Sequence, residues 1–377
     1  MTEYRFARPE EEPQILDLID LVFSQGTRPH DFRKLLPKVY AHPGFAGFHA
    51  VAVRENRIRA VIAMLPLTLH YAGGLLQGGY VGSVAVHSQS RGEGHMKALM
   101  QLQLDAARSQ SYDFLALGGQ RQRYGYFGFE NGGTALTFRL NSANMRHALP
   151  EADPDAVALR PLLDAADPAL LGIAALHEGQ PCFCRRDPAL LYDILRSYNA
   201  VPYAVEDRPS GALRGYFVAQ GSDISEMTLT DEALCAPVLK AWDRNHAGFS
   251  LRVWDGQTER GAFLRSVAEG YTLADAEMLR VLHWPRVLFA ALKFKNSYQP
   301  LPEGRKVIAI EGCGALCLLV KAGEAAVFPT GEAPDLTLTE QQAISFFFSP
   351  LSAFLQADPL LAAWLPLPLS LLTADQF

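Results

Sequence analysis

The strongest chemical pattern in the chain is residues 87–96, HSQSRGEGHM, which joins an apolar run to a helix-like run. Gly92 and Gly94 let the backbone come close to a ligand, because glycine carries no Cβ. The first N–H groups of a helix have no intrahelical partner and lie at the positive end of its dipole, which suits a phosphate. Arg91 adds a charge-assisted contact to such an anion. The segment therefore predicts a phosphate cradle.

Two common phosphate motifs do not fit this segment. A P-loop needs a Gly-Lys-Ser/Thr ending, which is absent here. A dinucleotide fingerprint needs three glycines, and residues 92–97, GEGHMK, supply two. The preceding strands are joined through Gly73–Gly74, as in an antiparallel meander, and no acid follows the next strand at the ribose position. A nicotinamide or flavin dinucleotide site is therefore disfavoured.

The elements that would position this turn are a strand before it and a helix after it. Residues 78–87, GGYVGSVAVH, read as a strand, and residues 92–110 read as a helix. Around them the pattern gives the order β-α-β-β-β-α-β-turn-β. We expect an α/β domain over residues 1–145.

Two further units follow. Residues 146–285 form a second α/β stretch whose strand-then-helix pairing lacks a glycine-rich turn. Residues 286–377 change to short strands followed by helical segments, which predicts an α+β unit. Their 345–348 run, SFFF, is expected to be core, with a lipid site as the alternative. Because no low-complexity linker separates the units, we expect them to pack tightly.

A family resemblance rests on two motifs. Arg91-x-x-Gly94-x-Met96, five residues beyond Val86, resembles the R/Q-x-x-G-x-G/A signature of the GNAT superfamily of acyl-CoA-dependent N-acyltransferases. Residues 117–130, LGGQRQRYGYFGFE, resemble the strand and Tyr-Gly-x-Phe-Gly-Phe turn found further along many GNAT domains. Met96 departs from the pattern, which has a small residue there.

The three-part layout is similar to that of the Eis-type (enhanced intracellular survival) acetyltransferases. Residues 334–352, PDLTLTEQQAISFFFSPLS, resemble their sterol-carrier-like unit. The resemblance implies tandem GNAT-fold domains, with mixed, mostly antiparallel sheets flanked by helices, and a C-terminal sterol-carrier-protein-like α+β domain. It implies acetyl-CoA as co-substrate and predicts no metal.

The resemblance also assigns roles to residues. The N–H groups at the end of the strand would meet the acyl carbonyl and the pantetheine, and the turn would surround the pyrophosphate. The residues expected to bind acetyl-CoA are Val84, Ala85, Val86, Arg91, Gly92, Gly94, His95 and Met96.

Two residues are the catalytic candidates. Tyr124 matches the family's general acid, which protonates the leaving thiolate; the alternative is aromatic packing, which is also the interpretation given to Tyr126. Phe377, the last residue of the sequence, would place its carboxylate in the first domain's active site as general base or amine anchor. The alternative is a tail that packs on its own domain. His87 and His95 are weaker candidates for a base, and surface positions are expected for both.

Composition narrows the remaining choices. The formal net charge is −6, which argues against a nucleic-acid partner and mildly favours cationic small molecules. The N-terminus lacks a signal-peptide pattern and no 18-residue apolar stretch occurs, so a cytoplasmic protein with no membrane partner is expected. The five cysteines are expected to be free thiols rather than metal ligands.

We therefore expect an acetyl-CoA-dependent N-acetyltransferase that transfers acetyl directly to a primary amine of a small cationic acceptor, of aminoglycoside, polyamine or lysine type. Members of that family often form symmetric oligomers, so a homo-oligomer is also expected. The alternative is a non-catalytic CoA-sensing protein with a carrier domain for lipid or another apolar ligand.

Overall fold

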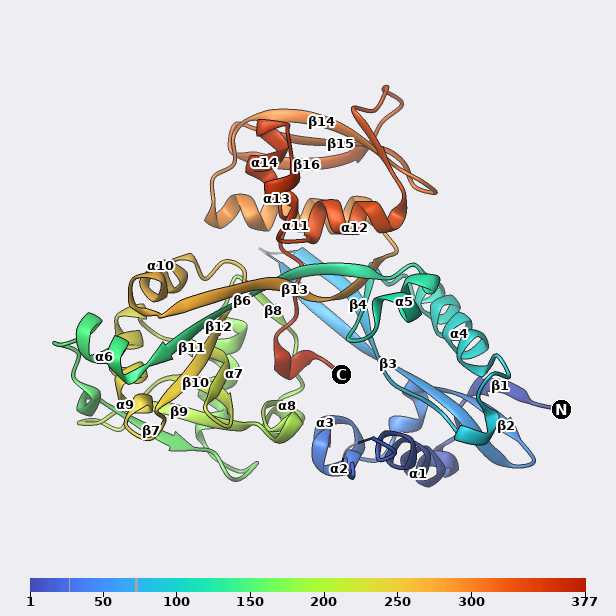
Figure 1. Cartoon of the computed structure of the whole chain (residues 1–377), viewed down its shortest axis with the longest axis horizontal. Helices are drawn as coiled ribbons and strands as arrows, with labels where there is room; N and C mark the ends of the chain where they lie inside the picture. The colour runs from blue at the N-terminus through green and yellow to red at the C-terminus, as the bar shows by residue number, and fades with distance from the viewer. Residues whose placement is uncertain (27, 72–73) are drawn as a thin grey trace.

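The computed structural model describes residues 1–26, 28–71 and 74–377 (Figure 1). Its strands form a central sheet of 13 strands and a separate sheet of 4 strands, with helices on the faces of both. None of the helices in these ranges is long and apolar enough to cross a membrane.

The first unit supplies one end of the central sheet. Its strands are β1 (Glu3–Phe6), β2 (His49–Arg54), β3 (Arg57–Tyr71), β4 (Gly74–Val86), β5 (Phe114–Leu117) and β6 (Glu130–Asn141). Its helices are α1 (Glu12–Phe23), α2 (Phe32–Leu35), α3 (Pro37–Tyr40), α4 (His95–Ser109) and α5 (Arg121–Tyr124). The predicted Gly73–Gly74 turn includes residue 73, which lies outside the described residues.

Alternation along β2 shows how this sheet is covered on both faces. Val51 and Val53 belong to the core beneath α1, whereas Ala50 and Ala52 belong to the core beneath α4. Successive side chains of a strand point to opposite faces, so a strand apolar at every position must be buried on both sides. The predicted mixed α/β fold of this unit is confirmed.

The second unit supplies the other end of the central sheet. Its strands are β7 (Val157–Pro161), β8 (Cys182–Cys184), β9 (Val201–Asp207), β10 (Leu213–Gln220), β11 (Asp223–Leu229), β12 (Gly248–Val253) and β13 (Gly270–Val281). Its helices are α6 (Ser142–Ala148), α7 (Ala169–Glu178), α8 (Leu191–Leu195), α9 (Cys235–Asp243) and α10 (Thr258–Val267).

The strands of the first two units are interleaved in one continuous sheet. The order along the central sheet is β1-β2-β3-β4-β5-β13-β6-β12-β11-β10-β9-β7, with β8 paired to β3. Strand β13 therefore lies between β5 and β6 and pairs antiparallel with both. The boundary predicted at residue 145 falls within α6 and does not separate two sheets, because both units contribute strands to the central sheet. The boundary predicted at residue 285 falls within α11 (Trp284–Tyr298), between the last strand of the central sheet and the first strand of the 4-stranded sheet.

Two helices of the third unit, α11 and α12, pack between its own sheet and the central sheet (Figure 1). Its helices are α11 (Trp284–Tyr298), α12 (Glu340–Phe348), α13 (Ser352–Leu355) and α14 (Pro359–Trp364), and its strands are β14 (Gly304–Ile310), β15 (Gly314–Lys321), β16 (Glu324–Pro329) and β17 (Leu336–Leu338). Phe347 and Phe348 are fully buried, so the predicted core role of the SFFF run is confirmed.

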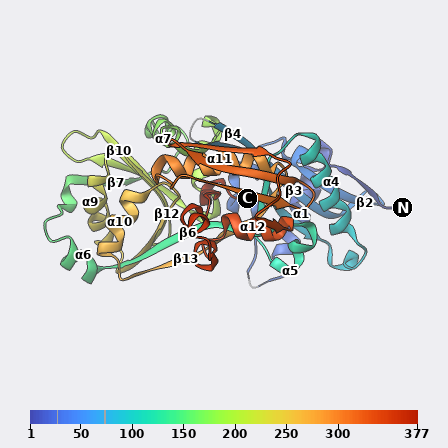
Figure 2. The same ribbon diagram turned by 90° about the horizontal axis from the view of Figure 1, so that it is seen from above.

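The C-terminal tail, residues 365–377, leaves the third unit and runs down into the centre of the molecule, where the chain ends (Figures 1 and 2). Its upper part is fixed by bonds to main-chain groups. Lys295 Nζ donates to the Pro366 carbonyl at 2.9 Å, and the Tyr71 hydroxyl donates to the Pro368 carbonyl at 3.0 Å.

The lower part of the tail is held by buried charges. Arg186 lies 2.8 Å from Asp375 and also forms two 2.8 Å bonds to Glu226, with all three side chains almost completely buried. Lys38 donates to the carbonyl groups of residues 374 and 376. Since such groups are stable in the interior only when paired, these contacts fix the position of the last residues.

Candidate active site

The site begins where β4 and β5 diverge. These parallel strands pair from Gly78↔Phe114 to Tyr80↔Ala116, after which β4 continues to Val86 while β5 stops at Leu117. Within this stretch Ser83 has a left-handed φ of 46°, and the pairing with β3 shifts register. A bulge of this kind bends the strand, so one edge of β4 is left without a neighbouring strand.

The glycine turn has the geometry expected of an anion cradle. Gly92 and Gly94 have φ angles of 82° and 81°, a region that other residues rarely adopt, and no atom lies within 4 Å of where their Cβ atoms would be. Helix α4 starts at His95, and its first intrahelical bond runs from Ala98 N–H to the Gly94 carbonyl. The N–H groups of residues 95–97 are thus free to bind a ligand.

A cavity of about 380 Å³ lies over this turn. It is lined by Val86, Ser90, Arg91, Gly92, Gly94, His95, Met96, Lys97, Tyr126 and Phe127. Six of the eight residues predicted to bind acetyl-CoA therefore surround one cavity. The open space at both glycines and the helix N-terminus fit a pyrophosphate group.

The histidines and the methionine around this turn differ in how deeply they are buried. His95 is buried, with Nδ1 2.9 Å from the Tyr4 hydroxyl, so the expectation of a surface histidine is wrong there. The group of His95 that remains available to a ligand in the cavity is its main-chain N–H. His87 is half-buried and accepts a bond from the Gln89 N–H. Met96 packs partly against the core beneath α4 while it also lines the cavity.

A second cavity, of about 500 Å³, holds both catalytic candidates. Tyr124 and Phe377 line it together with Val81, Gly82, Ser83 and Val84 of β4. Because Val84 lines this cavity and Val86 the other, the two cavities adjoin along the free edge of β4. Ala85 is 1% exposed and lines neither, so only its main chain remains a candidate contact.

Two glycines set the positions of the candidate side chains. A Cβ on Gly119 would lie 2.3 Å from the Tyr124 ring, and a Cβ on Gly82 would lie 2.5 Å from the Phe377 ring. Carbon atoms in contact are normally about 3.5–4.0 Å apart, so each ring packs directly on glycine backbone. Burial raises the pKa of Tyr124, while the Arg123 guanidinium beside it works in the opposite direction. The phenol therefore stays protonated at neutral pH, as a general acid requires.

Tyr126 differs from its predicted packing role. Its side chain is 67% exposed and lines the cavity over the glycine turn, where Lys97 Nζ lies 5.1 Å from the ring centroid of Tyr126. Lys97 is a cation at this cavity that the sequence analysis missed, although it stands inside the GEGHMK turn. A cation directly after the helix start is the signal that would have found it.

A buried chain of hydrogen bonds leads away from Ser83. The Tyr40 hydroxyl lies 2.7 Å from Ser83 Oγ and 3.0 Å from His49 Nε2, and His49 Nδ1 lies 2.7 Å from the Phe45 carbonyl. Burial lowers the pKa of His49 to about 4, so the ring is neutral. Tyr40, Phe45 and His49 lie within ten residues of one another, whereas Ser83 comes from β4, and no sequence pattern indicates that the two segments meet.

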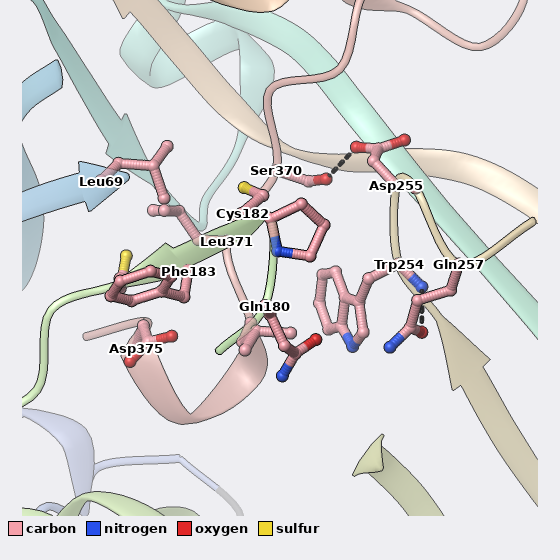
Figure 3. Close-up of a pocket in the computed structure, with 14 residues that line it drawn as sticks. Leu69, Gln180, Cys182, Phe183, Trp254, Asp255, Gln257, Ser370, Leu371 and Asp375 are labelled. Carbon is pink, nitrogen blue, oxygen red and sulfur yellow. Dashed lines mark hydrogen bonds between the residues drawn. The ribbon is translucent and has the colours of Figure 1, made fainter. Parts of the chain in front are cut away.

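A third, smaller cavity, of about 90 Å³, lies behind the tail (Figure 3). The Ser370 hydroxyl donates to Asp255 across it, and burial raises the pKa of Asp255 to about 6. Cys182 is one of its lining residues, and burial raises its pKa, so its thiol is protonated. All five cysteines are free, as expected. Four residues of the C-terminal tail, Ser370, Leu371, Leu372 and Asp375, form part of its wall.

The structure thus brings together a diverging strand pair, a glycine turn at a helix N-terminus and a buried tyrosine beside the opening. Residues 3–132 of the chain match the acetyltransferase (GNAT) domain. The domain match and the N-acetyltransferase structures among its neighbours support an acetyltransferase.

Several solved structures share the fold over the whole chain. A GCN5-related N-acetyltransferase from Anabaena variabilis is 18% identical, with a TM-score of 0.69 and 100% of both chains covered. Eis1 from Mycobacterium abscessus is 18% identical, with a TM-score of 0.65 and the same coverage. A probable N-acyltransferase from Enterococcus faecalis is 15% identical, with a TM-score of 0.68 and full coverage of both chains. No curated protein sequence matches the chain.

Proposed function

We propose that the protein is an acetyl-CoA-dependent N-acetyltransferase that transfers acetyl directly to a primary amine of a small molecule. The observation that carries this is the shared cavity, in which Tyr124 and Phe377 lie beside the free edge of β4 and next to the glycine turn. Acetyl-CoA would be held by the main chain of β4 and by the residue 91–97 turn, where it supplies the activated acyl group.

Three groups of the protein act in the proposed transfer. Main-chain N–H groups within residues 84–86 that point to the free edge of β4 stabilise negative charge on the carbonyl oxygen when the amine nitrogen attacks the thioester carbon; one such donor is worth about 3–4 kcal/mol. As the C–S bond breaks, Tyr124 gives its proton to the leaving thiolate. The carboxylate of Phe377 takes the proton that the amine loses.

The test compares Tyr124→Phe with the wild type. Thiol release from acetyl-CoA is followed with a panel of amines, and CoA affinity is measured by calorimetry. We expect turnover to fall by about 10²–10⁴-fold with CoA affinity unchanged, because the variant lacks only the acidic proton. Appending a few residues after Phe377 should also reduce turnover, and unchanged turnover there would remove the Phe377 carboxylate from the scheme.

The alternative is a non-catalytic CoA-sensing protein with a carrier domain. CoA binding without thiol release from any amine, together with co-purified lipid, would favour it over the transferase. The sterol-carrier resemblance of residues 286–377, the homo-oligomer and the cytoplasmic location stay predictions.

A further inference from the structure

The cavity that holds Tyr124 and Phe377 has an unusual charge balance for an enzyme that would acetylate polycations. Among the described residues that line it, Arg28, Arg123 and His30 are basic and none is Asp or Glu, so the one carboxylate contributed by these residues is the C-terminal group of Phe377. Neither guanidinium forms an ion pair within the part of the chain that the structure describes. Both residues are exposed while they line the cavity, which places them at its solvent side, its mouth.

Four carboxylates on the segments that supply the cavity's residues or contact them have partners of their own. Asp20 accepts a bond from the Phe32 N–H at 2.9 Å, and Asp31 pairs with Lys34 at 2.9 Å. On the tail side, Asp375 is paired with Arg186, and Glu277 accepts bonds from the N–H of Leu371 and the amide of Gln376. Each of these four carboxylates therefore already accepts at least one bond from another group of the protein.

An arginine fork binds carboxylate and phosphate through parallel charge-assisted bonds, and it repels an ammonium group. The sign of the charge at the cavity therefore favours an acceptor that carries an anionic group over one that carries a second ammonium group. The net charge of −6, which had favoured a cationic acceptor, is spread over the whole surface and does not describe this cavity.

We propose that the acceptor is a primary amine that carries an anionic group, carboxylate or phosphate, at its other end. This rests on the proposed transferase function. The amine reaches the buried end at Tyr124 and Phe377, while the anion binds Arg28 and Arg123 at the mouth. The rings of Phe23, Phe32 and Tyr198 provide an apolar wall for the carbon skeleton between them.

The test uses hexylamines that differ only at the far end: methyl, ammonium, carboxylate or phosphate. With wild-type protein we expect kcat/KM to be at least about 10-fold higher for the carboxylate or phosphate compound than for hexylamine, the effect of one charge-assisted contact. Comparing the carboxylate and phosphate compounds distinguishes the two anions. The diamine should be the poorest acceptor.

Variants assign the preference to the two arginines. Arg28→Gln should reduce the preference at least several-fold with hexylamine turnover little changed, whereas Arg33→Gln, an exposed arginine outside the cavity, should leave the preference intact. Arg123→Gln should also reduce the preference, and its hexylamine turnover is compared separately because Arg123 lies beside Tyr124. A preference for the diamine, or equal rates along the series, would overturn the inference but leave the transferase in place. Failure of every amine to release thiol would instead refute the proposed function.

A second inference concerns the direction of the Ser83–Tyr40–His49 chain. The Phe45 carbonyl can only accept, so His49 carries its proton on Nδ1 and its Nε2 must accept from Tyr40. The single Tyr40 proton is then used, and Ser83 donates its own proton to the Tyr40 oxygen. On the side of the cavity, Ser83 Oγ can therefore accept a hydrogen bond but cannot donate one.

We infer that Ser83 is a positioning residue that accepts an N–H bond from the attacking amine, again on the basis of the proposed function. Ser83→Gly removes the hydroxyl without strain, because glycine tolerates the positive φ at this position. We expect acceptor kcat/KM to fall about 5-fold, the effect of one neutral hydrogen bond, with CoA affinity and melting temperature unchanged. A drop confined to melting temperature would show a purely structural role and overturn the inference.

Discussion

Replacing Gly82 by alanine should displace the Phe377 ring. The new Cβ would lie 2.5 Å from Phe377 Cδ1 and 2.9 Å from its Cγ and Cε1. The strand cannot move away, because Gly82 pairs with Ala63 in the interior of the central sheet. To restore a normal carbon–carbon contact, the ring must retreat by about 1 Å.

The expected cost follows from this displacement. A misplacement of about 1 Å at a reacting group costs roughly 10²-fold in rate, which corresponds to about 2.7 kcal/mol of activation free energy. We therefore expect kcat for the best acceptor to fall by about 10²-fold. Thiol release under saturating acetyl-CoA measures it.

The matched control is Gly47→Ala, where no atom lies within 4 Å of the added Cβ and φ is not left-handed. This variant should keep wild-type kcat. CoA affinity should be the same in both variants, because the phosphate cradle is untouched. If Gly82→Ala turns over as fast as the wild type, Phe377 takes no part in the reaction and the assignment is wrong.

Three further predictions concern the buried charges. Burial raises the pKa of Glu277 from 4.5 to about 7, so between these pH values the native state holds a proton that the unfolded chain releases. The free energy of unfolding should therefore fall by about 3 kcal/mol as pH rises from 4.5 through 7. Urea unfolding at pH 5 and pH 8 should show a smaller loss in Glu277→Gln than in the wild type, and an equal loss would contradict this prediction. Arg186→Met leaves two carboxylates buried and unpaired and should cost about 3–5 kcal/mol of unfolding free energy, so a loss below about 1 kcal/mol would be inconsistent with the network. Lys38→Met removes the donor to two tail carbonyls and should lower kcat more than CoA affinity; equal losses in both would indicate a general unfolding effect.

The parts of this site that the sequence predicts are those encoded within a short segment. Gly92, Gly94 and the start of α4 follow from backbone chemistry over a few residues, and the structure places them as expected. The position of Tyr124 beside Gly119 is local in the same way. Periodicity also predicts the strands and helices of the first unit well.

The parts that the sequence does not predict depend on which distant segments meet. Residue patterns show that a strand is apolar on both faces, but they do not name its neighbour, so the place of β13 between β5 and β6 is not predictable from them. Arg28 and Arg123 each look like ordinary surface arginines in the sequence. Their effect on the acceptor arises only because one cavity brings them together.

The place of β13 also has a consequence for how the molecule folds. Strand β5 cannot complete its pairing until residues 270–281, which lie far along the chain, have docked beside it. Proteins dominated by such long-range pairings fold slowly, because closing a large loop lowers the entropy of the chain before the new contacts can compensate for that loss. The two halves of the central sheet should therefore fold as one cooperative unit, and residues 1–145 expressed alone should expose an unpaired, aggregation-prone strand edge.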